Sequence, residues 1–158
     1  LVGQKQIFIK GNSCKTILKT PAFTQTLIFN TQQDTAIILK EIGMNKFLQY
    51  ILYASMQPVN LVASKKNANT STLLDYPCET ITLSWADGNS MDVTYTNLII
   101  PTVTVYEQAF KEIPGLVMRY QLTSKEGNKI LYNANKVDLS PITLNVFEVN
   151  KSNYQQIN

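Results

Sequence analysis

The segment Leu73-Leu-Asp-Tyr-Pro-Cys-Glu-Thr-Ile-Thr-Leu-Ser-Trp85 is followed by Ala86-Asp-Gly-Asn-Ser90 and then by Met91-Asp-Val-Thr-Tyr-Thr96. Apolar and polar residues alternate in the first and last of these pieces, and successive side chains of a strand point to opposite faces. Each piece therefore predicts a strand with one apolar face. Asp87-Gly88 lies between them and is typical of a tight hairpin turn, because such turns need positive φ. The sequence thus predicts an antiparallel hairpin at the centre of the chain.

The same alternation predicts strands over residues 6–10, 14–20, 23–30, 35–41, 58–65, 116–123, 129–139 and 142–146. Polar connections separate them, including a loop over 65–71, and short connections favour an antiparallel meander. At 158 residues the chain is most simply one domain. The polar tail from about residue 150 is expected to be loose. The predicted fold class is mainly β.

Two segments carry helical patterns. Over 105–112, apolar residues fall on one side, Thr104 and Glu107 fit a capping box, and Pro114-Gly115 ends the segment. This pattern predicts a helix. Over 42–53, the apolar spacing favours a helix slightly, but a strand fits the same residues, since a short apolar run cannot be assigned by periodicity alone.

Composition excludes several function classes. The net charge is +3 and the charged fraction 16%, without the clustered Lys and Arg of a nucleic-acid-binding surface. No apolar run approaches the roughly 18 residues of a membrane-spanning helix. The sequence contains no histidine, which removes Ser-His-Asp and Cys-His catalysis and most zinc sites. We expect no enzyme, no metal and no cofactor. Asp87 and Asp92 flank the hairpin turn and could bind a cation, but two carboxylates without further ligands usually serve the turn itself.

The order of these features resembles a protein family. Asp75-Tyr-Pro-Cys78, Trp85-Ala-Asp-Gly88, Ile113-Pro-Gly115 and Val117-Met-Arg-Tyr-Gln-Leu122 occur together, with Phe147 and Tyr154 near the end. This set is similar to an uncharacterised family of envelope proteins with the outer-membrane lipoprotein carrier (LolA-like) fold. Asp75 departs from the glycine of the family pattern. The resemblance implies a curved antiparallel sheet of about ten strands, an incomplete barrel, with one or two short helices on its concave side.

The resemblance also implies a location and a function. The protein would lie in the periplasm or at the outer membrane, with its targeting segment removed, and could have an envelope protein partner. It would bind a lipid-like or acyl-chain ligand in the hollow of the half-barrel. The alternative is an envelope scaffold with a filled core and no ligand. A connected cavity of several hundred cubic ångströms would favour the carrier.

Nine residues are candidates for the lining of that hollow. They are apolar or aromatic and lie on the central hairpin, the predicted helix and the strand after it: Leu83, Trp85, Val93, Tyr95, Tyr106, Phe110, Ile113, Met118 and Tyr120. The simpler interpretation is that they fill the core between sheet and helix, because apolar stripes are core by default.

Two cysteines, Cys14 and Cys78, leave two alternatives open. They could form a disulfide in the oxidising compartment that the resemblance implies. They could instead be unpaired thiols buried as small apolar side chains.

Overall fold

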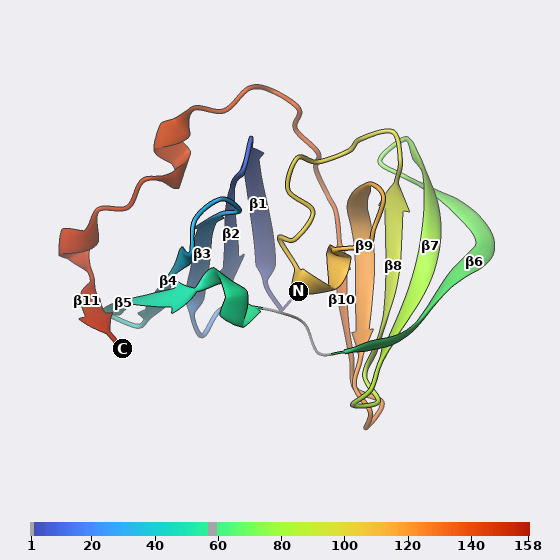
Figure 1. The fold of residues 1–158 in the computed structure, drawn as a ribbon, viewed down its shortest axis with the longest axis horizontal. Helices are drawn as coiled ribbons and strands as arrows, with labels where there is room; N and C mark the ends of the chain where they lie inside the picture. The colour runs from blue at the N-terminus through green and yellow to red at the C-terminus, as the bar shows by residue number, and fades with distance from the viewer. Residues whose placement is uncertain (1, 57–59) are drawn as a thin grey trace. The chain divides into compact units, whose positions relative to one another are not determined.

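The computed structural model describes residues 2–56 and 60–158, and the prediction of a mainly β protein is confirmed (Figure 1). The described strands form two sheets rather than a single curved one, and these sheets are not closed into a barrel. The chain divides into two compact units. Unit 1 consists of residues 1–57 and 141–158, and unit 2 consists of residues 58–140.

Unit 1 contains a six-stranded sheet in the order β1-β2-β3-β4-β5-β11. Its first five strands form an antiparallel meander, whereas β11 pairs in parallel with β5. The strands are β1 (Gln4–Lys10), β2 (Ser13–Lys19), β3 (Thr24–Asn30), β4 (Thr35–Ile42), β5 (Asn45–Leu52) and β11 (Gln155–Ile157). Each meander strand was expected from its alternation, apart from β5.

Most of segment 42–53 forms strand β5 (Asn45–Leu52), so the slight preference for a helix was wrong there, and Tyr53 begins a 3-10 helix, η1 (Tyr53–Met56). Both faces of this strand carry apolar residues, so the apolar positions in the sequence resemble the spacing of a helix. The register pairs Leu39 with Leu48, and Leu48 is buried at 3% exposure. Gly43 begins the turn between β4 and β5 with φ 59°, which suits glycine. The turn and the neighbouring strand therefore decide the conformation of this segment.

The C-terminal segment covers one face of this sheet and is not loose. Phe147, Val149 and Tyr154 pack with Ile37 against the buried cluster of Ile28, Leu39 and Leu48. The predicted strand over 142–146 is wrong, because a 3-10 turn, η3 (Leu144–Phe147), occupies part of it. A second turn, η4 (Lys151–Asn153), precedes β11. These apolar anchors hold a segment whose polar composition favours disorder.

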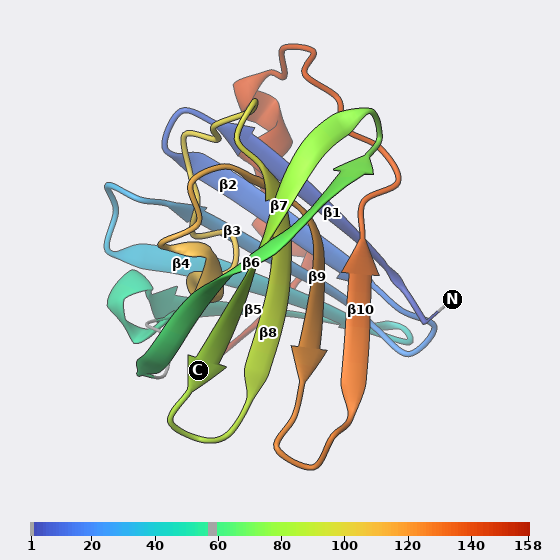
Figure 2. The ribbon, with the colours of Figure 1, turned by 90° about the vertical axis from the view of Figure 1, so that its right-hand side faces the viewer.

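Unit 2 contains a five-stranded antiparallel sheet in the order β10-β9-β8-β7-β6 (Figure 2). The strands are β6 (Leu61–Leu73), β7 (Tyr76–Trp85), β8 (Ser90–Thr96), β9 (Leu116–Thr123) and β10 (Lys129–Asn133). The central hairpin, β7 and β8, is confirmed. The predicted loop over 65–71 belongs to β6 and is wrong. The predicted strand over 58–65 starts in residues 57–59, which lie outside the described part.

The helix predicted over 105–112 forms only in part, and as a 3-10 helix. A single 3-10 turn, η2 (Gln108–Phe110), forms there, with hydrogen bonds from Phe110 N to Glu107 O and from Ile113 N to Phe110 O. A helix of eight residues is marginal by itself. Four buried side chains of segment 97–115 fix its path instead: Val103, Tyr106, Phe110 and Ile113. Gly115 approaches Thr96 so closely that an added Cβ would lie 2.0 Å from the Thr96 carbonyl oxygen.

Both cysteines are free and buried, so the disulfide considered above is not formed. Cys14 belongs to β2 in unit 1, and Cys78 belongs to β7 in unit 2. Burial raises the pKa of Cys14 to about 12 and also raises the pKa of Cys78. The thiolate is the reactive form of cysteine, so neither thiol is activated.

We predict that both thiols alkylate slowly in the native protein. Raising the Cys14 pKa from 9.0 to about 12 lowers its thiolate fraction roughly a thousandfold near neutral pH. Iodoacetamide labelling followed by intact mass measurement checks this, with denatured protein as the control that gains two labels. A non-reduced mass two hydrogens lower, or rapid double labelling of native protein, would contradict the prediction.

A second prediction concerns the turn between β6 and β7, where Leu74 and Asp75 have φ values of 48° and 67°. The left-handed region costs an ordinary residue about 1–2 kcal/mol, and asparagine tolerates it better. Leu74 is 41% exposed, so Leu74→Asn loses little burial. We expect this variant to raise the free energy of unfolding by about 1 kcal/mol. Leu98→Asn, at a 66% exposed position without positive φ, is the control. Equal denaturant midpoints for both variants would refute the strain.

Candidate functional site

Eight of the nine candidate residues lie in the packed core of unit 2. Their exposures range from 0% for Val93 to 6% for Tyr120. The sheet register places the strand members of the set on one face, because Ile81 pairs with Val93 and Val93 pairs with Tyr120. Tyr106, Phe110 and Ile113 belong to segment 97–115. The exception is Trp85, which is only half-buried. The core interpretation therefore holds for most of the set.

Segment 97–115 lies over this face and is held there by a chain of aromatic contacts. The Phe110 ring lies edge-on to Tyr106 and Tyr120, with centroid distances of 5.3 Å and 5.1 Å. Tyr120 in turn stacks on Tyr132 at 4.4 Å. Such pairs contribute about 0.5–1.5 kcal/mol each beyond the area that they bury. The aromatic cluster packs between this face of the sheet and segment 97–115.

The buried hydroxyl groups of this cluster have hydrogen-bond partners. The Tyr106 hydroxyl accepts a hydrogen bond from Val117 N at 3.2 Å, and the Tyr120 hydroxyl donates one to Glu107 Oε1 at 3.4 Å. Burial raises the pKa of Tyr120 well above its usual range. The Glu107 carboxylate, expected in a capping box, accepts this hydrogen bond from Tyr120. These hydrogen bonds help to hold segment 97–115 against the sheet.

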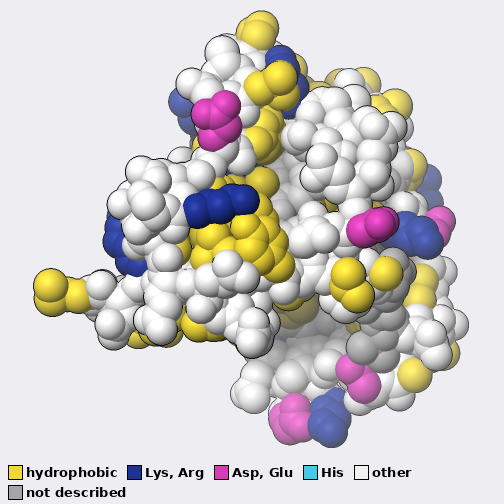
Figure 3. Space-filling view, turned by 60° about the vertical axis from the view of Figure 1, so that its left-hand side comes forward, with side chains coloured by type: hydrophobic (Ala, Val, Ile, Leu, Met, Phe, Trp, Pro, Cys, Tyr) yellow, Lys and Arg dark blue, Asp and Glu magenta, His cyan; other side chains and the backbone are white. Residues whose placement is uncertain are grey.

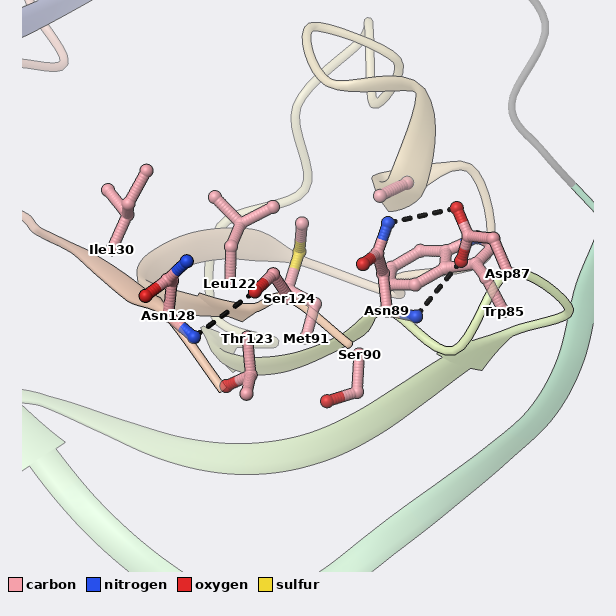
Figure 4. Close-up of a pocket in the computed structure, with 11 residues that line it drawn as sticks. Trp85, Asp87, Asn89, Ser90, Met91, Leu122, Thr123, Ser124, Asn128 and Ile130 are labelled. Atoms are coloured by element: carbon pink, nitrogen blue, oxygen red, sulfur yellow. Dashed lines mark hydrogen bonds between the residues drawn. The ribbon is translucent and has the colours of Figure 1, made fainter. Parts of the chain in front are cut away.

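A groove of about 350 Å³ lies beside this core, at the end of the sheet where the two hairpin turns are (Figure 4). Its apolar lining comes from β7, β8, β9, β10 and η2, through Trp85, Met91, Leu122, Ile130 and Ala109. Its polar lining comes from the turns and their flanks: Asp87, Asn89, Ser90, Thr123, Ser124 and Asn128. Trp85 is the one candidate residue that the structure places in a groove.

The two hairpin turns brace each other and form the polar rim of the groove. The Asn89 side-chain oxygen accepts a hydrogen bond from Lys125 N at 3.1 Å, which joins the β7–β8 turn to the β9–β10 turn. Asp87 holds Asn89 through two hydrogen bonds of 2.9 Å, one to its backbone N and one to its side-chain Nδ2 (Figure 4). Gly88 leaves room for the Lys125 side chain, which would be 3.1 Å from an added Cβ. These contacts preform the rim.

Ten of the eleven lining residues were not among the nine candidates, and the apolar strand residues Met91, Leu122 and Ile130 are three of these ten. The sequence did carry their signal. Met91 is two positions before Val93 on β8, and Leu122 is two positions after Tyr120 on β9, so each shares the apolar face with a named candidate. Ile130 pairs with Leu122. Periodicity could not indicate where segment 97–115 ends. Alternation shows which residues share a face of the sheet, but it does not show which part of that face another segment buries.

Unit 1 has a smaller recess of about 180 Å³ under the C-terminal segment. Lys15, Thr26, Glu148, Asn150 and Asn153 give it a more polar lining than the groove of unit 2. The Lys15 ammonium group already donates a hydrogen bond to the Val146 carbonyl oxygen at 2.9 Å. This recess therefore fits trapped water better than an apolar ligand.

Other kinds of site find little support in the described residues. Residues 2–56 and 60–158 contain no group of three or more His, Cys, Asp or Glu side chains suited to holding a metal ion. None of the helices in that part has the length and apolarity needed to cross a bilayer. On the face in Figure 3, charged side chains are few among neutral polar ones. The groove beside Trp85 is the best candidate.

Comparison with protein-family models and with curated proteins gives no match for this chain. The functional argument therefore starts from the groove and its residues.

We predict that Phe110→Ala lowers the free energy of unfolding by about 3–5 kcal/mol, because a buried phenylalanine loses its contacts and leaves a cavity. Phe110 is 1% exposed and touches two tyrosine rings. Urea unfolding followed by Trp85 fluorescence reports on unit 2. Leu131→Ala is the control, since Leu131 is 57% exposed and should change the stability by less than about 0.5 kcal/mol. Similar losses in both variants would mean that Phe110 does not anchor the core.

Proposed function

We propose that this protein is a binding module that takes a small apolar or amphipathic ligand into the groove beside Trp85, and that it catalyses no reaction. The observation that carries the proposal is the groove itself, an open volume of about 350 Å³ with a mainly apolar lining. Ligand sites typically have volumes of about 300–1,000 Å³, an apolar lining and a few polar groups. An enzyme would need converging acid, base or nucleophilic groups, and the lining offers Asp87 among neutral side chains.

The size of the groove bounds the affinity. A dissociation constant of 1 μM corresponds to about 8.2 kcal/mol. At about 25 cal/mol per Å², this requires roughly 330 Å² of covered apolar surface before any cost of association. Ile130 is 58% exposed, so part of the lining stays open to water. We therefore expect binding in the high micromolar range, helped by a rim that is already braced by hydrogen bonds.

The proposal differs from the carrier that the resemblance implies. An acyl chain in the hollow of a half-barrel would need the space that Tyr106, Phe110 and Tyr120 fill. A ligand at the end of the sheet needs no displacement of these rings. A location in the periplasm or at the outer membrane, and kinship with the carrier fold, remain proposals that rest on the sequence motifs.

A second candidate function is a scaffold without a ligand. The observation that favours it is the filled core, where eight candidate residues are at most 6% exposed. A scaffold would use its surface and leave the groove to solvent. The two candidates differ in whether the groove takes up an apolar molecule in solution.

Fluorescence of Trp85 tests the proposal directly, because the sequence contains one tryptophan and it lines the groove. We predict that decanol gives a saturable change in Trp85 emission and that a bromoalkyl alcohol quenches it. Ile130→Gln should weaken the binding several-fold. Leu131→Gln should not, although Leu131 is equally exposed at 57%, because neighbouring strand residues face opposite ways and Leu131 does not line the groove.

Circular dichroism of both variants checks that the sheet is retained. A linear, non-saturable response of Trp85, or equal weakening by Ile130→Gln and Leu131→Gln, would reject the groove as a binding site and favour the scaffold.

A further inference from the structure

We propose that the ligand of the Trp85 groove carries a cationic head group, a primary or quaternary alkylammonium, rather than a carboxylate. This inference rests on the proposed function and specifies its ligand. It follows from the chemistry at one end of the groove, where an aromatic ring and a carboxylate both line the same space. Aromatic faces bind ammonium groups, tryptophan most strongly, and a nearby carboxylate adds to the attraction.

The hairpin turn brings these two groups to the same end of the groove. Trp85 ends β7, and Asp87 lies two residues later in the turn, which Trp85 N closes by donating to the Asn89 carbonyl oxygen at 3.0 Å. In Figure 4, the Trp85 ring, the Asp87 carboxylate and the Asn89 side chain occupy one end, and Ile130 occupies the other. A head group near Asp87 would therefore leave an alkyl chain directed along Met91 and Leu122 towards Ile130.

The Asp87 carboxylate keeps hydrogen-bonding capacity for a ligand. Its two oxygens accept one hydrogen bond each from Asn89, both at 2.9 Å. A carboxylate offers about four lone-pair sites, so about two remain. Asp87 is exposed, which leaves these sites accessible from the groove. A primary ammonium group could donate to them, a quaternary ammonium group would be attracted by charge alone, and a fatty-acid carboxylate would be repelled.

Neighbouring side chains do not neutralise the negative charge of Asp87. Among the eleven lining residues in the described part of the chain, Asp87 is the one that carries a charge. On the adjacent turn, the Lys125 ammonium group lies 3.9 Å from the Glu126 carboxylate, so these two charges offset each other. Lys129 precedes Ile130 on β10, and its side chain points to the opposite face of the strand. The described lining of the groove therefore carries one negative charge, that of Asp87.

The expected selectivity is modest because Asp87 is exposed. At about 4 Å in water, a pair of unit charges interacts strongly enough to change an equilibrium constant about fivefold. Salt weakens such exposed interactions, since the screening length falls from about 10 Å at 0.1 M to about 3 Å at 1 M ionic strength. The charge thus selects the head group, and apolar contact provides most of the affinity.

The test compares decyltrimethylammonium, decanol and decanoate, each below its micelle concentration, by titration against Trp85 emission. At low ionic strength we expect the ammonium compound to bind about three- to tenfold more tightly than decanol, and decanoate to bind most weakly. High salt should bring the three affinities together. Asp87→Asn should remove the preference for the ammonium, so that the ammonium compound and decanol bind this variant with similar affinity.

Asp92→Asn is the matched control. Asp92 lies on the polar face of the same hairpin, where it accepts a hydrogen bond from the Thr82 hydroxyl at 2.6 Å, and it does not line the groove. If decanoate binds wild-type protein as tightly as the ammonium compound at low salt, the head-group inference is wrong while the groove still binds ligand. If none of the three compounds saturates the Trp85 signal, the proposed function itself fails. The salt dependence of the wild-type protein decides the inference even if Asp87→Asn does not fold.

Discussion

The packing of Phe110 against Tyr106 and Tyr120 is the interaction on which unit 2 depends. Segment 97–115 has little regular structure, with a single 3-10 turn, so neither a long helix nor a strand ladder holds it in place. Its position comes from side chains that reach the sheet, and Phe110 is the largest of those that are fully buried. The aromatic contacts place this segment over the apolar face of β8 and β9, and they thereby decide which part of that face stays open.

The groove is the part of the apolar face that this cover does not reach. Ala109, a small residue beside Phe110, is the one residue of the cover that lines the groove, so the space below it remains available. The floor continues the core in sequence and in register, from Val93 to Met91 on β8 and from Tyr120 to Leu122 on β9. The same alternation that builds the core therefore builds the groove. The extent of segment 97–115 decides which residues of this face are buried in the core and which line the groove.

The sequence predicts most strands well where polar and apolar residues alternate, as in the β7–β8 hairpin, because one face must then be buried. Segment 142–146 is an exception, since it alternates but forms part of η3. Prediction from the sequence fails where another constraint dominates. In β5 both faces carry apolar residues, and this pattern resembles the spacing of a helix. In segment 105–112 the buried side chains fix the conformation despite the capping pattern. In the C-terminal tail, packing of Phe147, Val149 and Tyr154 holds a segment whose other residues are mostly polar. Of the groove, only Trp85 was named in advance. Its neighbours belong to the same face, but their exposure depends on where segment 97–115 ends, which periodicity does not encode.

The contrast between core and rim also explains why specificity would come from the turns. The aromatic cluster has filled its space and satisfied its hydroxyl groups, so it offers a ligand neither room nor polar contacts. The turns, by contrast, carry Asp87, Asn89 and Ser124 on backbone that hydrogen bonds already fix. A ligand that meets preorganised polar groups does not have to order them, so more of its interaction energy appears as affinity. A shallow apolar groove alone would accept any small apolar molecule, and it is the fixed charge of Asp87 beside the Trp85 ring that gives this groove a basis for choosing among them.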